Sequence, residues 1–118
     1  MLSRSVYGLT NRHNIYIVYF MEQPCLKLRL AKKAAKAIDK MPDKHFCQVY
    51  DAVEALRVDP EPRDSKELSS NVIPKRRRKD VGEYRIIYWH DDETLYVDVV
   101  GKRNDGEVYK KAKRKGIL

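Results

Sequence analysis

The densest run of apolar side chains predicts a buried strand at Tyr84–Trp89. A polar turn, Asp91-Asp92-Glu93, and a second β-prone segment, Thr94–Val100, follow directly, which indicates a hairpin. Gly82 is expected to supply the turn that leads into the first of these strands. The other predicted elements are arranged around this hairpin.

Upstream, the hydrophobic period changes from that of a strand to that of a helix. Residues 25–30 alternate apolar and basic side chains, as a half-buried strand does. From there to Met41 the apolar positions fall at helical spacing, with lysines mostly on the other side. Met41-Pro42-Asp43 is expected to end this helix, and Asp43 to be the N-cap of the next one.

The second helix is predicted from one apolar stripe that ends at two prolines. Asp59-Pro-Glu-Pro62 stops it, because proline cannot continue the helical hydrogen bonding. Two short antiparallel helices of this kind are expected to pack on one sheet. The stripe consists of Phe46, Val49, Tyr50, Val53 and Leu56.

A polar connection, residues 63–71, leads from the helices to a basic run, with Leu68 as its expected anchor in the core. If the run Lys75–Lys79 is a strand, its side chains point alternately to opposite faces. Arg76 and Arg78 would then share one face. Lys75, Arg77 and Lys79 would share the other.

The two ends of the chain are less regular. Residues 1–24 are interpreted as an N-terminal extension that contributes little to function, and Asn14–Phe20 within it is either an extra edge strand or part of a poorly ordered segment. Gly106–Lys115 is a short basic tail or helix. The fold class is therefore a small single α+β domain, residues 25–118, in β-α-α-β-β-β order, with two helices packed on a mainly antiparallel twisted sheet.

Composition narrows the class of partner. With 118 residues the chain has room for one core, and its net charge of +8 and pI near 9.5 favour a polyanion. No apolar stretch is long enough to span a membrane, and Met1–Phe20 lacks the order of a secretory signal. Cysteines and histidines are too scattered to predict a metal site, so a reduced, cytoplasmic protein without a cofactor fits best. These residues are Cys25, Cys47, His13, His45 and His90.

Two arginines, Arg85 and Arg103, lie within and just beyond the predicted hairpin. A desolvated guanidinium costs several kcal/mol unless an anion pairs with it. The partner is either a nearby Asp or Glu or an external phosphate, whose geometry suits the guanidinium fork. A twisted sheet would gather a cluster on one concave face: Arg76, Arg78, Arg85, Arg103 and Tyr109.

Such a cluster can serve metal-independent cleavage of RNA. The reaction needs a deprotonated 2′-hydroxyl in line with phosphorus, stabilised charge on the phosphorane oxygens and a protonated 5′ oxygen. Arginines serve the second need, and a tyrosine among cations, such as Tyr109, serves the first or the third. Each feature also has a plainer explanation, since a basic run is most often a solvated or nonspecific nucleic-acid face. Tyr109 alone is more often a packing residue, and His90 is more often a turn residue than a base.

Several motifs resemble the RelE/ParE toxin superfamily, and the RelE branch in particular. The resemblance spans about 90 residues from Leu26. It rests on Ala34–Pro42, Ala55-Leu56…Asp59-Pro60, Glu67-Leu68, Gly82-Glu-Tyr-Arg-Ile-Ile-Tyr88, and Val100-Gly-Lys-Arg103 with Glu107-Val-Tyr109. It implies that Arg85, Arg103 and Tyr109 are catalytic, and that Arg76 and Arg78 occupy positions where the family commonly has lysines.

The two arginines at lysine positions are a departure from the family pattern. An arginine effectively cannot transfer a proton, so this role falls to Tyr109, or to Lys75 or Lys79 if the register is shifted. The remaining cations are expected to bind RNA: Lys75, Arg77, Lys79, Lys102, Lys110 and Lys111.

The resemblance implies an endoribonuclease that cleaves mRNA in the ribosomal decoding site and is blocked by an acidic antitoxin in a hetero-oligomer. Two alternatives stay open. One is a ParE-like inhibitor of DNA gyrase with the same fold, against which Arg103 and Tyr109 argue. The other is a noncatalytic RNA- or ribosome-binding module, whose binding salt would weaken without any cleavage.

Overall fold

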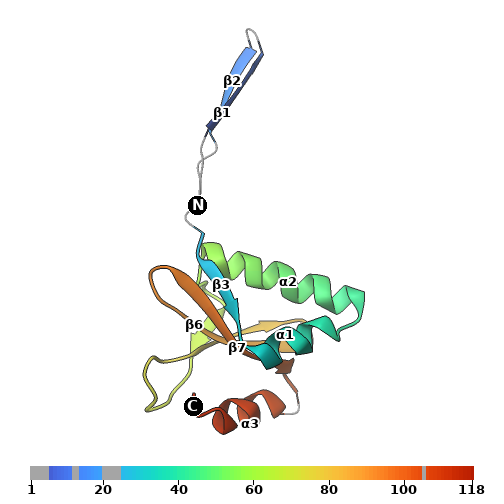
Figure 1. The fold of residues 1–118 in the computed structure, drawn as a ribbon, viewed down its shortest axis with the longest axis vertical. Helices are drawn as coiled ribbons and strands as arrows, with labels where there is room; N and C mark the ends of the chain where they lie inside the picture. The colour runs from blue at the N-terminus through green and yellow to red at the C-terminus, as the bar shows by residue number, and fades with distance from the viewer. Residues whose placement is uncertain (1–5, 12–13, 20–24, 105) are drawn as a thin grey trace.

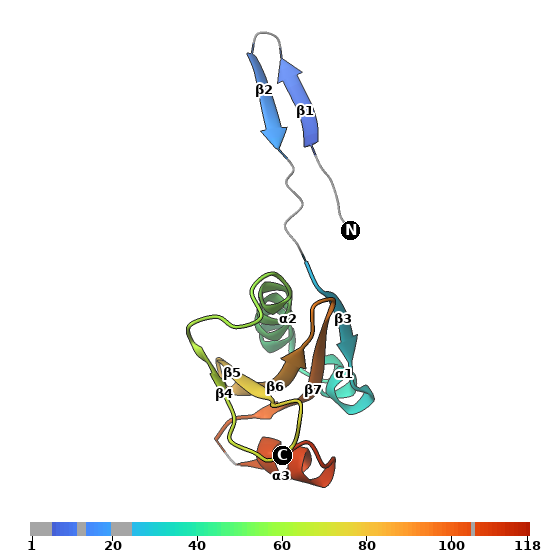
Figure 2. The same ribbon diagram turned by 90° about the vertical axis from the view of Figure 1, so that its left-hand side faces the viewer.

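A five-stranded sheet with helices on both faces forms the body of the protein (Figures 1 and 2). The computed structural model describes residues 6–11, 14–19, 25–104 and 106–118. The chain order is β1 (Val6–Asn11), β2 (Asn14–Tyr19), β3 (Lys27–Leu30), α1 (Lys32–Asp39), α2 (Asp43–Val58), β4 (Ser65–Glu67), β5 (Arg77–Val81), β6 (Tyr84–His90), β7 (Thr94–Lys102) and α3 (Glu107–Arg114).

The sheet has the strand order β3-β7-β6-β5-β4. Every neighbouring pair is antiparallel except β3 and β7, which run parallel. After β3, helices α1 and α2 carry the chain over one face of the sheet to its far edge. The chain then returns through β4, β5 and β6, and β7 lies beside β3. The predicted α+β class and mainly antiparallel sheet are confirmed.

The sheet separates two apolar clusters. On one face, α1 and α2 bury Ala34, Val49 and Leu56 against Ile86 and other side chains of β6 and β7. On the other face, α3 packs Val108 and Ala112 against Ile87 and Val99. Each large aliphatic side chain buried in this way stabilises the fold by about 1.5–3 kcal/mol.

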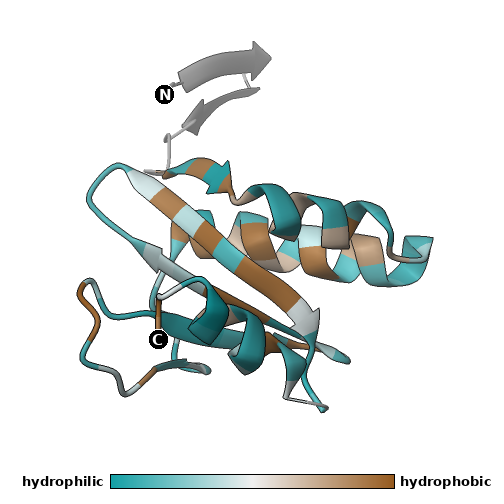
Figure 3. Ribbon diagram, turned by 60° about the horizontal axis from the view of Figure 1, so that its bottom comes forward, coloured by the Kyte–Doolittle hydropathy of each residue, from teal (hydrophilic) through white to brown (hydrophobic). Residues whose placement is uncertain are grey.

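The hydropathy pattern explains which elements the sequence revealed. Brown (hydrophobic) segments recur along the long strand β7 and on helices α1 and α2 beside it, whereas the C-terminal helix α3 is mostly teal (hydrophilic) (Figure 3). The predicted helices and the β6–β7 hairpin are confirmed, and Leu68 packs against the α3-side cluster as expected. The segment 106–115, for which tail and helix were both open, contains α3.

Three details of the prediction are wrong. Asp43 is the first residue of α2 rather than its N-cap, because the extended Pro42 takes the cap position. Tyr50 was expected in the buried stripe of α2, but it is 50% exposed and stacks on Phe46. It directly follows the buried Val49, so its side chain points to a different side of the helix. Strand β4, which the interpretation of residues 63–71 as a connection left out, pairs with β5.

The N-terminal strand at Asn14–Tyr19 pairs with β1 in a separate two-stranded sheet, so it is not an edge strand of the domain sheet. His13, and the parts of the predicted extension at 1–5, 12–13 and 20–24, lie outside the described residues. Within the described part of the chain, no helix is long and apolar enough to cross a membrane.

Candidate active site

The face of the sheet beneath α3 carries alternate residues of β5 and β6. Arg78 pairs with Ile87, and Asp80 pairs with Arg85. Gly82, with φ of +56°, and Glu83 form the two-residue loop that closes this hairpin with Val81 opposite Tyr84. The loop sets the register, and the register brings Arg78, Asp80 and Arg85 to the same face.

Helix α3 brings Tyr109 over this face. Gly106, with φ of +72°, precedes the helix, and the buried Val108 and Ala112 fix it to the sheet. The Tyr109 hydroxyl oxygen accepts hydrogen bonds from a terminal nitrogen of Arg78 and one of Arg85, each at 2.9 Å. The Arg85 guanidinium also lies 5.3 Å from the centre of the tyrosine ring. Because the oxygen accepts twice, its own hydrogen remains available to donate to a third group.

Asp80 is the anion at the centre of the cluster. Its carboxylate accepts from Arg85 Nε at 2.6 Å and from a terminal nitrogen of Arg85 at 3.1 Å, and it lies 3.6 Å from the guanidinium of Arg103. The hydrogen bond from Arg85 holds the pKa of the Asp80 carboxyl below its ordinary value. The charges of Arg85, Arg78 and Arg103 lower this pKa further, against the opposing effect of burial. The pKa of Arg85 is raised, first by its hydrogen bond to Asp80.

Sequence reasoning missed Asp80, although the signal was present. A two-residue loop at Gly82-Glu83 places the residue two before the loop opposite Arg85, and that residue is Asp80. Of the two partners weighed for Arg85, the structure supplies the carboxylate. Arg103 is 42% exposed at its side chain and shares this carboxylate with Arg85, and its catalytic role stays a prediction.

Arg76 has its own partners. It is 8% exposed, and its Nε donates to Asp98 at 3.0 Å while a terminal nitrogen donates to the Pro74 carbonyl at 2.6 Å. Its guanidinium lies 5.5 Å from the centre of the Trp89 ring. These contacts tie Arg76 to β7 and to the loop before β5, and none of them joins it to Tyr109. Its catalytic role stays a prediction.

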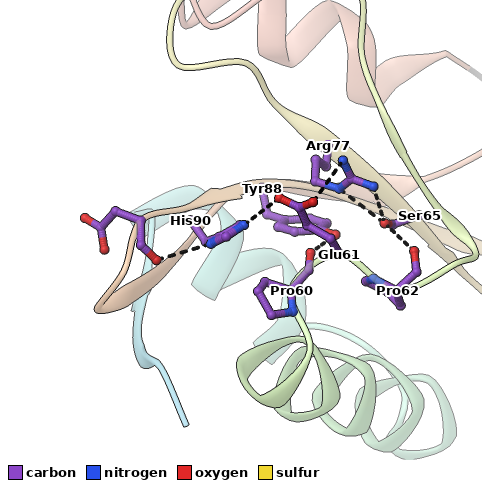
Figure 4. A network of polar contacts seen from close by, with 8 residues as sticks. Pro60, Glu61, Pro62, Ser65, Arg77, Tyr88 and His90 are labelled. Carbon is purple, nitrogen blue, oxygen red and sulfur yellow. Dashed lines mark hydrogen bonds and ion pairs between the residues drawn. The ribbon is translucent and has the colours of Figure 1, made fainter. Parts of the chain in front are cut away.

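The opposite face of β5 carries Arg77 and Lys79, whereas Lys75 and Arg76 precede the strand, so the run Lys75–Lys79 is only partly a strand. Arg77 donates to Ser65 Oγ at 2.8 Å and lies 4.0 Å from Glu61, and Glu61 is 2.9 Å from His90 Nε2 (Figure 4). The pKa of Glu61 is lowered, mainly by its hydrogen bond with His90. Lys79 pairs with Asp64. The predicted alternation between Arg78 and its two neighbours is therefore seen, and neither neighbour reaches Tyr109.

The other predicted RNA contacts lie at the surface. Lys102 and Lys110 are exposed, Lys111 is half-buried, and Lys75 donates to the Ser70 carbonyl. An open pocket of about 600 Å³ borders Tyr109, with Leu68, Leu118 and the polar segment 69–72 in its lining. Among the described residues, no three His, Cys, Asp or Glu side chains are arranged to hold a metal ion. The arrangement can bind a phosphate group and exchange a proton at one phenol.

Comparison with solved structures identifies the fold. No protein-family model matches the sequence, and no curated protein matches it. The chain is similar to a chain of the archaeal RelE–RelB complex of Pyrococcus horikoshii, with 22% identity and a TM-score of 0.59 over 69% of this chain and 98% of that one. It is also similar to a chain of the RelBE2 toxin–antitoxin complex of Mycobacterium tuberculosis, with 25% identity and a TM-score of 0.58 over 69% and 94%. The isolated RelE toxin of Escherichia coli gives 22% identity and a TM-score of 0.57 over 76% and 97%.

Proposed function

The chain has the RelE-like toxin fold, and we propose that it is the toxin of a toxin–antitoxin pair, an endoribonuclease that cleaves mRNA on the ribosome. The observation that carries the proposal is the Tyr109 hydroxyl held between the guanidinium groups of Arg78 and Arg85, with Arg103 beside them. Two guanidinium groups on one phenol, and a third that shares the Asp80 carboxylate with Arg85, suit a phosphate that gains charge during the reaction.

In the proposed reaction the 2′ oxygen of the message attacks phosphorus and the bond from phosphorus to the 5′ oxygen breaks. A proton leaves the 2′-hydroxyl and a proton reaches the 5′ oxygen. Arg85 and Arg103 stabilise the negative charge that builds on the non-bridging oxygens. Among the phenol and its guanidinium neighbours only Tyr109 can transfer a proton, so it serves one of these two transfers.

The lysine alternative for proton transfer loses support from the strand register. Lys79 pairs with Asp64, and Lys75 reaches the Ser70 carbonyl. Arg78 is the residue of the basic run that donates a hydrogen bond to the phenol. Proton transfer by Tyr109 is therefore the assignment we adopt.

The proposed partners are the ribosome with its message and an acidic antitoxin. Two of the similar solved structures are toxin–antitoxin complexes, and the charge of +8 suits an acidic protein as well as RNA. A hetero-oligomer with the antitoxin in the cytoplasm, where ribosomes work, follows from this proposal.

Primer extension on a message translated with the purified protein tests the function. Cuts that appear only with ribosomes support the proposal, and their loss in Arg85→Ala by about 10²-fold would tie them to this site. Cuts in naked RNA would indicate a free ribonuclease. Gyrase poisoning without cuts would indicate the ParE-like activity, and salt-sensitive ribosome binding without cuts would indicate a noncatalytic module.

A further inference from the structure

The donors of Arg85 are divided between two partners. Asp80 takes the Nε hydrogen and one hydrogen of a terminal nitrogen, at 2.6 and 3.1 Å. Tyr109 takes one hydrogen of the other terminal nitrogen at 2.9 Å. A guanidinium has five N–H groups, so one remains on each terminal nitrogen. Because Asp80 binds along the Nε edge, the edge formed by the two terminal nitrogens is left for Tyr109 and a phosphate oxygen.

We propose that Asp80 is a positioning residue for the cleavage proposed above: it holds Arg85 by the Nε edge, so that the two terminal nitrogens meet the scissile phosphate beside Tyr109. Asp80 also lies 3.6 Å from Arg103, so one carboxylate orders both arginines. It does not touch the reacting atoms. Its second effect is electrostatic, since it offsets one of the positive charges that attract RNA.

The two effects act in opposite directions on the kinetics. Asp80→Asn keeps the shape and one acceptor but removes the charge and one of the two hydrogen bonds to Arg85. A freed guanidinium loses its orientation, and small misplacements of a catalytic group are costly, so kcat should fall by about tenfold or more. The added net positive charge should leave KM for the ribosome-bound message unchanged or lower. A merely structural residue would not give this split.

Asp64→Asn is the matched control. Asp64→Asn removes the same charge as Asp80→Asn. The partner of Asp64 is Lys79, which lies on the face of β5 turned away from Tyr109. Its kcat should equal that of the wild type. A second control is Asp80→Asn in an Arg85→Ala/Arg103→Ala background. If Asp80 acts through these two arginines, the added substitution should cause no further loss of kcat.

One readout does not depend on cleavage. In arginine-selective NMR, the Arg85 Nε–H should exchange slowly with solvent in the wild type and in Asp64→Asn, and rapidly in Asp80→Asn. Rapid exchange in the wild type would overturn the proposal even if no RNA is cut, which separates its failure from failure of the proposed function. In a protein that does cut, a higher kcat for Asp80→Asn would show that Asp80 competes with phosphate. A further loss in the Arg85→Ala/Arg103→Ala background would show that Asp80 acts as a base itself.

Discussion

At the scale of the residue, Arg76 and Arg78 have the same side chain and different surroundings. Arg78 reaches the Tyr109 hydroxyl, and Arg76 is buried between Asp98 and the Trp89 ring. Alternation along the basic run predicts that both face the same way, but not which partner each finds. The partner of Arg76 depends on a bulge in β7. Asp98 lies in this bulge, between the residues that pair with Ile87 and Tyr88.

Both substitutions to alanine should impair cleavage, by different routes. Arg76→Ala leaves Asp98 without its partner, so the free energy of unfolding should fall by about 3 kcal/mol. Arg78→Ala should leave thermal stability nearly unchanged and lower the cleavage rate by about 10²-fold. Thermal melts and single-turnover cleavage, measured where both variants are folded, separate the two. A fully stable Arg76→Ala that no longer cuts would place Arg76 at the phosphate.

Asp80 should also leave a signature in acid. Its pKa lies below the ordinary value of 3.8, so the unfolded state binds protons more tightly than the folded one. The stability that Asp80 contributes is present above about pH 4 and is lost as the pH falls through the folded-state pKa. Denaturant unfolding between pH 2 and about pH 5 should show a shallower loss for Asp80→Asn than for the wild type. Equal slopes would mean that the ion pair with Arg85 does not form in solution.

At the scale of the element, the sequence predicts what periodicity can encode. Strands β6 and β7 and helices α1 and α2 carry enough apolar positions to be recognised, because each buries a face. Strand β4 has the sequence Ser-Lys-Glu and no apolar residue, so only its pairing with β5 reveals it. Asp80 was missed for a related reason. Its pairing with Arg85 depends on the length of the loop at Gly82-Glu83, which hydrophobic periodicity does not encode.

Gly101 links an element boundary to the site. It pairs with Arg85 across the sheet, and a methyl group there would lie 3.0 Å from a methyl of Val108. Gly101→Ala should therefore push α3 outward and displace Tyr109. Stability should fall by about 1–3 kcal/mol from overpacking, and cleavage by about tenfold or more. The double variant Gly101→Ala/Val108→Ala restores the space, and should cut faster than Gly101→Ala in the same assay. A wild-type rate for the single variant would show that α3 tolerates the shift.

At the scale of the whole molecule, the net charge is +8, and exposed cations of the described residues lie outside the Tyr109 cluster as well as in it. Lys102 lies at the end of β7, and Lys110 on α3, and both are exposed. Such cations are expected to act on association and not on the chemical step.

Removing two of these lysines together tests that separation. Lys102→Ala/Lys110→Ala should weaken ribosome binding and reduce the slope of log affinity against log salt by about one to two, with no change in single-turnover rate. Lys40→Ala/Lys44→Ala removes the same charge near the turn between α1 and α2, where both residues are exposed. This control should change binding less. Equal losses would mean that net charge alone, and no defined face, attracts the ribosome.

In the proposed reaction, the Tyr109 hydroxyl, held by Arg78 and Arg85, transfers a proton during cleavage of mRNA. The most direct test is the single-turnover cleavage rate of a ribosome-bound message by the wild type and by Tyr109→Phe, with thermal melts of both. Phe keeps the ring under the Arg85 guanidinium and removes only the hydroxyl, so stability should change by about 1 kcal/mol or less. The cleavage rate should drop by roughly 10²-fold or more. An unchanged rate in a folded Tyr109→Phe variant would contradict the claim and leave Tyr109 as a packing residue.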